Sequence, residues 1–223
     1  MRVLLFGATG MVGQAALRES LLDPGVTSVV SVGRTPTGAQ HPKLREVTTP
    51  DLFDLTAYVE ALNGHDAAFF CLGVTSAGLS EESYTRLTFS LTILIAKELA
   101  GRNPGMTFVY VSGSGTDSSE HGRSMWARVK GRTENTLLRL PFRAAYMFRP
   151  GFIVPLDGIQ SKTRSYRLFY SALSPLLPLL HRFFPKAILT TRELGHAMLI
   201  VSREGAPKPV LEARDLRALL LRG

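Results

Sequence analysis

Cysteine is nearly absent from this chain of 223 residues, and this scarcity limits the chemistry it can support. The single cysteine, Cys71, excludes an intramolecular disulfide and any zinc site built on a cysteine cluster. The five histidines are scattered along the chain, with no second ligand at a spacing that suits a metal. We therefore expect no metal site, and we expect a reducing compartment, which we take to be the cytoplasm.

Long apolar runs are also missing. The first one, residues 3–6, ends after four residues at Gly7 and is too short for the core of a secretory signal peptide. The most apolar stretch, residues 168–189, is interrupted by three prolines and three basic or histidine side chains, so it falls short of the ~20 apolar residues that a membrane span needs. We expect a lid packed over the sheet edge, with peripheral contact to a membrane surface as the alternative.

The charge balance is strongly basic but carries little information about partners. Of 26 basic residues only six are lysines, and the basic residues are dispersed along a chain with a net charge of +8. A general bias toward arginine in the composition explains this charge as well as a function does. We therefore do not expect nucleic-acid binding. A small-molecule substrate is expected, and a protein partner remains open.

Short apolar runs alternate with helical patterns along most of the chain. The expected helices cover residues 11–22, a long stretch that opens at Ser80, and residues 123–140, and Thr190 with Glu193 predicts a capping box for a fourth. The expected strands are residues 2–6, 28–32, 44–48, 66–72, 106–111 and 144–148. This succession predicts an α/β fold, a doubly wound parallel sheet of order 3-2-1-4-5-6, with a possible seventh strand near Ile188 or Val210.

The most specific motif lies between the first strand and the first helix. Gly7, Gly10 and Gly13 occupy a strand-turn-helix context in which glycines let backbone N–H groups approach a pyrophosphate at a helix N-terminus. The alternative is a merely tight turn. We expect residues 1–155 to form a dinucleotide-binding Rossmann core, and residues 156–223 to form a small C-terminal helical lid or substrate segment that completes the same domain.

The Gly-x-x-Gly-x-x-Gly spacing resembles the short-chain dehydrogenase/reductase superfamily, in particular its extended and atypical members. The chain as a whole is most similar to the Tat-interacting-protein oxidoreductase-like branch. Asp51 matches an acidic residue that members place against the adenine, although Asp54 offers a competing register and either could cap the next helix. The resemblance implies cofactor contacts at Gly7, Thr9, Gly10, Met11, Val12, Gly13, Asp51, Leu52, Leu72, Gly73, Val74, Ser112, Lys130, Pro150, Gly151 and Phe152.

Arg34 follows the second strand, where an acidic residue would accept hydrogen bonds from an unmodified ribose. A guanidinium can instead bind a 2′-phosphate through two hydrogen bonds. The sequence therefore favours NADP(H) over NAD, with a solvated surface arginine as the alternative.

The catalytic positions implied by the resemblance are incomplete. Ser112 matches the substrate-orienting serine, and Lys130 matches the lysine of the Tyr-x-x-x-Lys motif, but Trp126 stands in place of the tyrosine. An indole donates a hydrogen bond but is not a physiological proton donor, and general acid catalysis is worth ~10²–10⁴-fold. Lys130 could still bind ribose, while Ser112, Ser114 or water could supply the proton.

Two functions follow from this pattern. One is an NADP(H)-dependent oxidoreductase that reduces a small carbonyl substrate, with catalysis weakened by Trp126. The alternative is a non-catalytic NADP(H)-binding sensor or accessory protein at a membrane surface. Cys71 is expected to be a buried apolar residue, because its neighbours offer nothing that would stabilise a thiolate.

Overall fold

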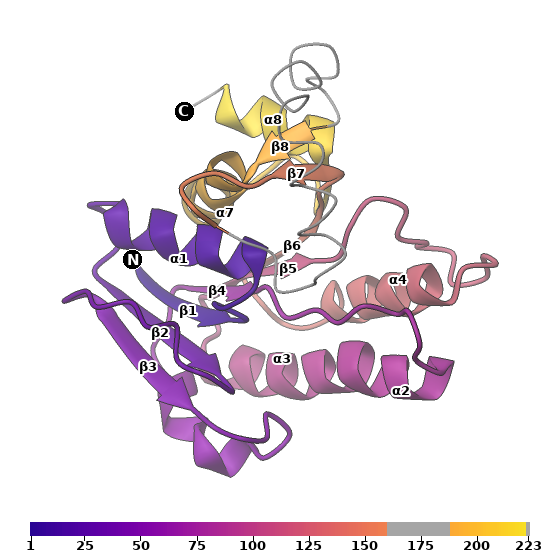
Figure 1. Cartoon of the computed structure of the whole chain (residues 1–223), viewed down its shortest axis with the longest axis horizontal. Helices are drawn as coiled ribbons and strands as arrows, with labels where there is room; N and C mark the ends of the chain where they lie inside the picture. The colour runs from indigo at the N-terminus through magenta and orange to yellow at the C-terminus, as the bar shows by residue number, and fades with distance from the viewer. Residues whose placement is uncertain (160–187, 222–223) are drawn as a thin grey trace.

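A seven-stranded parallel sheet with helices on both faces forms the centre of the protein (Figure 1). The computed structural model describes residues 1–159 and 188–221, so most of the 168–189 segment discussed above lies outside the described residues. The strand order is β3-β2-β1-β4-β5-β6-β9, which confirms the predicted doubly wound order. The strands are β1 (Arg2–Phe6), β2 (Ser28–Gly33), β3 (Leu44–Thr48), β4 (Ala67–Phe70), β5 (Thr107–Val111), β6 (Ala144–Arg149) and β9 (Val210–Glu212).

Strand β1 lies at the point where the strand order reverses. It pairs with β2 on one side and with β4 on the other, so that Leu4 faces Val30 and Ala68. Its successive residues enter opposite cores: Val3 belongs to one hydrophobic cluster and Leu4 to the other, and both are fully buried. Burial on both faces explains why the sequence of a parallel strand is a continuous apolar run. In an open sheet of this kind, ligands bind outside the carboxyl ends of the strands at this reversal.

One face of the sheet is covered by α1 (Met11–Leu22), α7 (Thr191–Glu204) and α8 (Ala213–Leu220) (Figure 1). The capping box predicted for α7 is present, since Thr190 Oγ1 accepts from the Glu193 N–H and Glu193 Oε2 accepts from the Thr190 N–H. Helices α1 and α7 approach closely at Gly195, where an added Cβ would lie 2.6 Å from Glu19 Cγ.

The other face carries α2 (Glu81–Thr85), a π-helical turn (Arg86–Ser90), α3 (Leu91–Arg102) and α4 (Met125–Leu137). The long helix predicted from Ser80 is therefore present, and the Ser80 hydroxyl caps it by accepting from the Ser83 N–H. Two short 3₁₀ turns, η1 (Leu55–Ala57) and η2 (Val59–Leu62), connect β3 to β4. None of the helices in the described ranges is long and apolar enough to cross a membrane.

The structure refines several of the predicted boundaries. Of the two positions considered for a seventh strand, Val210 joins the main sheet as part of β9, whereas Ile188 begins β8 (Ile188–Thr190). Strand β8 pairs with β7 (Phe152–Val154) in a separate two-stranded sheet. The strand expected over residues 66–72 is shorter, Ala67–Phe70, although the Cys71 N–H still donates to the Phe6 carbonyl oxygen of β1 at 2.9 Å.

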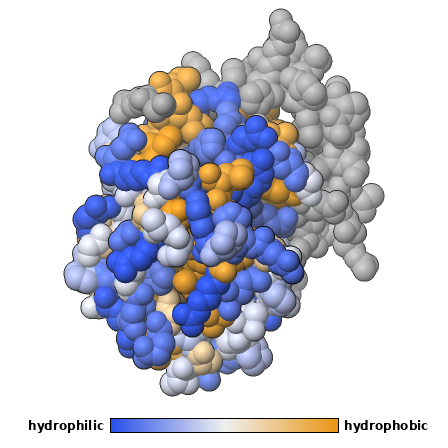
Figure 2. All heavy atoms as spheres, turned by 90° about the vertical axis from the view of Figure 1, so that its left-hand side faces the viewer, coloured by the Kyte–Doolittle hydropathy of each residue, from blue (hydrophilic) through white to orange (hydrophobic). Residues whose placement is uncertain are grey.

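Hydrophilic residues cover most of the face turned toward the viewer in Figure 2, while hydrophobic residues gather near its top and in patches across its centre. This face is the left-hand side of Figure 1, where α1, β2 and β3 lie.

Candidate functional site

The turn between β1 and α1 has room for a side chain at only one of its three motif glycines. Gly7 has a φ of +82°, and a Cβ there would lie 2.7 Å from backbone carbonyl atoms of Cys71 at the end of β4. At Gly13 an added Cβ would lie 1.9 Å from the Gly7 carbonyl oxygen. Gly10 has an extended backbone, and a Cβ there would meet only the Gly7 carbonyl oxygen, at 3.4 Å. The outer glycines therefore close the turn, whereas the middle one leaves space in front of the helix.

The N-terminus of α1 is suited to an anion. No side chain caps it, and its first turn carries no acidic residue. The first N–H groups of a helix lack intrahelical partners and form the positive end of the helix dipole. A cavity of about 560 Å³ opens at this end, which is the arrangement that a pyrophosphate requires. Its lining is formed by Gly7–Val12, Ser31, Gly33, Arg34, Thr35, Leu52, Cys71, Leu72 and Gly73.

Arg34 lies at the edge of this first cavity, directly after β2, and is exposed. Among the ion pairs of the described residues none involves Arg34, and no acidic residue lines the cavity. The neighbouring Thr35 adds a hydroxyl group to the same rim. The guanidinium is thus available to an anionic group bound in the cavity.

The two aspartates considered for the adenine region both bond to backbone groups of their own loop. Asp51 Oδ1 accepts from the Phe53 N–H at 2.9 Å, and Asp54 Oδ1 accepts from the Thr56 N–H at 3.1 Å, which caps η1. Leu52 lines the first cavity, but neither aspartate does.

A second cavity of about 450 Å³ adjoins the first and shares part of its lining, from Met11 and Val12 on one side and Cys71–Gly73 on the other. It lies between the ends of β4, β5 and β6, so residues far apart in the sequence meet there. The further lining residues are Val111, Ser112, Gly113, Lys130, Pro150, Gly151, Phe152 and Ile153.

Four of the residues expected at the site do not line either cavity. Gly13 is enclosed within the turn, Asp51 bonds to its own loop, and Val74 is 39 % exposed. Trp126 is half-buried beside Gly115, with its ring atom Cη2 3.4 Å from the position that a Cβ on that glycine would take. The remaining expected residues line one cavity or both.

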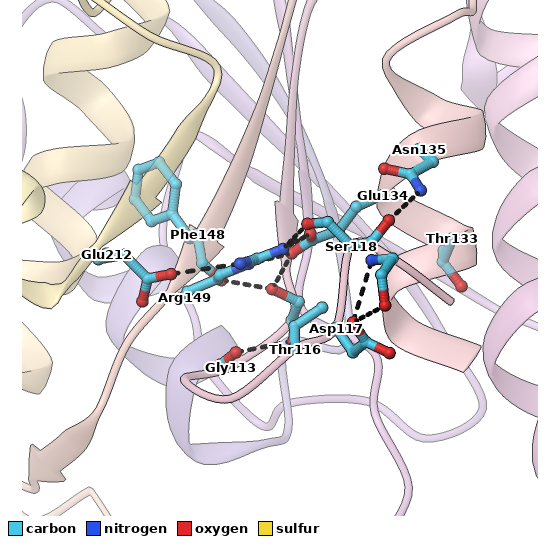
Figure 3. A network of polar contacts seen from close by, with 12 residues as sticks. Gly113, Thr116, Asp117, Ser118, Thr133, Glu134, Asn135, Phe148, Arg149 and Glu212 are labelled. Carbon is cyan, nitrogen blue, oxygen red and sulfur yellow. Dashed lines mark hydrogen bonds and ion pairs between the residues drawn. The ribbon is translucent and has the colours of Figure 1, made fainter. Parts of the chain in front are cut away.

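Ser112 belongs to a buried polar network, in which its partners Glu134 and Phe148 are labelled in Figure 3. Its Oγ lies 2.5 Å from Glu134 Oε1 and 3.1 Å from the Phe148 carbonyl oxygen, so its one proton is already shared between two acceptors. Glu134 also accepts from Arg149, whose guanidinium reaches Ser118 Oγ at 2.6 Å and Glu212 Oε1 at 3.3 Å. The Ser112 hydroxyl thus belongs to the network that joins α4, β6 and β9.

Lys130 projects from α4 toward the end of β5. Its Nζ donates to the backbone carbonyl oxygen of Ser112, and its side chain lines the second cavity. Burial lowers the pKa of Lys130 to about 8, and the carboxylate of Glu134 opposes that shift. In the same cavity, burial raises the pKa of the Cys71 thiol to about 12, so this cysteine is a neutral thiol at ordinary pH.

Three residues of this network were not predicted from the sequence as site residues: Glu134, Ser118 and Glu212. Glu134 follows Lys130 by four residues on a helix, and this spacing places both side chains on one face, which was the available signal. The Glu212 contact arises only when β9 pairs with β6, and the Ser118 contact arises only when the loop after β5 meets the end of β6.

No family model matches the chain. Among curated proteins, Protein HTATIP2 from Rattus norvegicus is 29 % identical over 175 residues, which cover 77 % of this chain and 71 % of that protein. The mitochondrial protein fmp52 from Emericella nidulans is 31 % identical over 159 residues, 68 % of this chain and 66 % of the relative. The match therefore spans about two thirds of the fungal protein's length.

Solved structures share the fold at low sequence identity. A short-chain dehydrogenase/reductase superfamily protein from Agrobacterium tumefaciens with bound NAD superposes with a TM-score of 0.67 at 17 % identity, over 100 % of this chain and 81 % of that one. The Bordetella bronchiseptica enzyme WbmF in complex with NAD⁺ gives 0.67 at 15 % identity, over 97 % and 76 %.

The expected cytoplasmic location is wrong in the light of these relatives, because several of the fungal proteins are named as mitochondrial. The expectation rested on the scarcity of cysteine, and the lack of a disulfide does not specify which reducing compartment holds a protein.

Proposed function

Because the chain belongs to the short-chain dehydrogenase/reductase superfamily as an atypical member, we propose that its two adjoining cavities bind NADP(H) and that it reduces a small carbonyl substrate. The first cavity would hold the adenosine and pyrophosphate portion, and the second would hold the nicotinamide end together with the substrate. Residues 1–155 would then supply most of the cofactor site.

One observation carries this proposal: the uncapped N-terminus of α1 opens into the same cavity as Arg34. The helix end suits the pyrophosphate, and the Arg34 guanidinium, which forms no ion pair with any described residue, suits a 2′-phosphate. Among the described residues no acidic side chain lines this cavity, so the usual acceptor for a free ribose 2′-hydroxyl is missing from them, and this supports NADP(H) over NAD.

The chain's own residues would perform three tasks. Backbone N–H groups around Gly10 would hold the pyrophosphate, Lys130 would bind the nicotinamide ribose, and Phe152 would pack beside the ring. When bound, the reduced nicotinamide supplies a hydride. The apolar lining contributed by Val12, Leu72 and other residues would exclude water from the reacting groups.

Calorimetric titration with NADPH tests this assignment, using wild type and Gly10→Val. The extended backbone of Gly10 accepts valine, but the side chain would fill the space in front of α1 and block the pyrophosphate. We expect binding by wild type, loss of binding by the variant, and similar thermal melts for both. Unchanged binding by Gly10→Val would show that the glycine turn is structural only.

A second function has its own support in the site. The Ser112 hydroxyl is committed to Glu134 and Phe148, and no phenol lines the second cavity among the described residues. Both features favour an NADP(H)-binding sensor or accessory protein without turnover. Single-turnover oxidation of NADPH over a panel of carbonyl compounds separates the two functions, because a sensor retains the cofactor in its reduced form.

A further inference from the structure

Few side chains of the second cavity can give up a proton. Within the described part of the chain, its lining contains only three side chains with a proton on oxygen, sulfur or nitrogen: Ser112, Cys71 and Lys130. The Ser112 hydroxyl already donates within the buried network. Trp126, at the place of the missing phenol, does not line the cavity.

We propose that Lys130 itself is the proton donor of this cavity, acting directly on the substrate oxygen in place of the absent tyrosine. The proposal rests on the proposed function, because the substrate and the reduced nicotinamide would share the cavity that Lys130 lines. Lys130 is then a catalytic residue and not only a ligand of the ribose.

The step balances with NADPH as the reductant. The carbonyl carbon accepts a hydride with its electron pair, and the π pair of the C=O bond moves onto oxygen. The Lys130 ammonium transfers one proton to that oxygen, which gives an alcohol, NADP⁺ and a neutral amine. Water then returns a proton to the amine.

The surroundings of Lys130 suit an acid that works near neutral pH. Ser112, directly after β5, holds the Lys130 Nζ through its carbonyl oxygen. Among the described residues, the carboxylate that acts on the Lys130 ammonium is that of Glu134, one turn later on α4. That carboxylate is shared with Arg149 of β6, while Cys71 faces the cavity from the end of β4. Tyr110 of β5 lies near Glu134, and burial raises its pKa, so it stays neutral. A lysine with a pKa of about 8 is charged at pH 7 and releases its proton more readily than an exposed lysine.

The first experiment needs no cofactor. Trace labelling with acetic anhydride between pH 6 and 11, read by peptide mass spectrometry, reports the pH at which each amine becomes nucleophilic, with free Nα-acetyl-lysine as the reference. We expect the Lys130 midpoint near pH 8, more than one pH unit below that of the reference. A midpoint equal to that of the reference would overturn the proposal.

The second experiment measures single-turnover NADPH oxidation with aliphatic and aromatic aldehydes and ketones from pH 6 to 10. The rate constant should be level at low pH and fall tenfold per pH unit above the Lys130 midpoint, because only the ammonium form donates. Lys130→Arg keeps a positive charge and N–H donors but cannot release a proton in this range, so we expect it to bind NADPH and lose ~10²–10⁴-fold in rate. The exposed Lys97 provides the matched control, and Lys97→Arg should behave as wild type.

The outcomes separate this proposal from the function on which it rests. Equal rates for Lys130→Arg and wild type, or a rate independent of pH, would overturn Lys130 as the donor and leave NADP(H) binding intact. A wild type that binds NADPH but reduces no carbonyl would also overturn it. A wild type that binds no NADPH would overturn the proposed function itself. If Lys130→Arg fails to fold, Lys130→Met tests the same loss of the proton. A Lys130→Met variant that folds, binds NADPH and keeps the wild-type rate would overturn the proposal.

Discussion

Glu134 of α4 and Arg149 of β6 form a buried ion pair, with Arg149 Nε 3.0 Å from Glu134 Oε1 and 3.2 Å from Oε2 (Figure 3). The Glu134 side chain is 1 % exposed and that of Arg149 is 10 % exposed. Arg149 directly precedes Pro150, which lines the second cavity, and Glu134 lies one turn after Lys130. The pair therefore joins α4, which carries Lys130, to the end of β6, which leads directly into the Pro150 lining of the candidate nicotinamide site.

Breaking this pair should be costly, because it leaves one charge buried without its partner. We expect Glu134→Gln to lower the free energy of unfolding by about 3–5 kcal/mol, measured by urea denaturation. The matched control is Glu98→Gln, which removes a carboxylate from the more exposed pair with Arg102 and should cost no more than about 1 kcal/mol. Equal losses in the two variants would contradict a structural role for the buried pair.

Gly131 lies where α4 comes very close to the backbone of Asp117. A Cβ at this residue would lie 1.7 Å from the Asp117 carbonyl oxygen, in the loop that follows β5. We expect Gly131→Ala to destabilise the protein by about 1–3 kcal/mol, because the loop must move away from the helix. Gly101→Ala in α3 is the control: no atom lies within 4 Å of its Cβ position, so alanine should stabilise by about 0.5–1 kcal/mol. Thermal melts of both variants would decide, and a stabilised Gly131→Ala would refute the close contact.

Trp126 precedes Lys130 by one helical turn, so a tyrosine there would lie on the same face of α4 as the ammonium group. Because Lys130 is proposed to supply the proton and position 126 lines neither cavity, we expect Trp126→Tyr to leave the rate of NADPH-dependent carbonyl reduction close to that of wild type. Single-turnover rates of Trp126→Tyr and Trp126→Phe give the comparison, since phenylalanine has the same ring without the hydroxyl. A Trp126→Tyr variant that is ~10²–10⁴-fold faster than Trp126→Phe would show that a phenol at this position reaches the reacting oxygen, and would contradict the placement of position 126 outside the cavity.

The sequence predicted the sheet well, because its signals are local. The apolar run before Gly7 and the helical spacing from Met11 to Leu22 identified a βα unit whose helix has those same limits in the structure. Thr190 and Glu193 form a capping box three residues apart, and this contact is also local. The strand order then followed from the right-handed crossovers of βαβ units.

Contacts between distant segments could not be predicted in the same way. The sequence places Ser112 at the end of a strand, but its hydroxyl is committed to Glu134, 22 residues later, and to the backbone of β6. The position of Trp126 outside the cavity likewise depends on how the loop carrying Gly115 folds against α4. Such pairings are set by packing, and a periodic pattern in the sequence contains no record of them.

Titration of NADPH and NADH against wild type and Arg34→Ala tests the central claim most directly, because Arg34 is the residue that we propose distinguishes the two cofactors. We expect wild type to prefer NADPH, and Arg34→Ala to lose about 1.5–3 kcal/mol of NADPH binding free energy with little change for NADH. Arg45→Ala, which removes an exposed arginine of β3 outside both cavities, should leave both affinities unchanged. Equal affinities for the two cofactors in wild type, or an equal loss for both in Arg34→Ala, would contradict the assignment of this cavity to NADP(H).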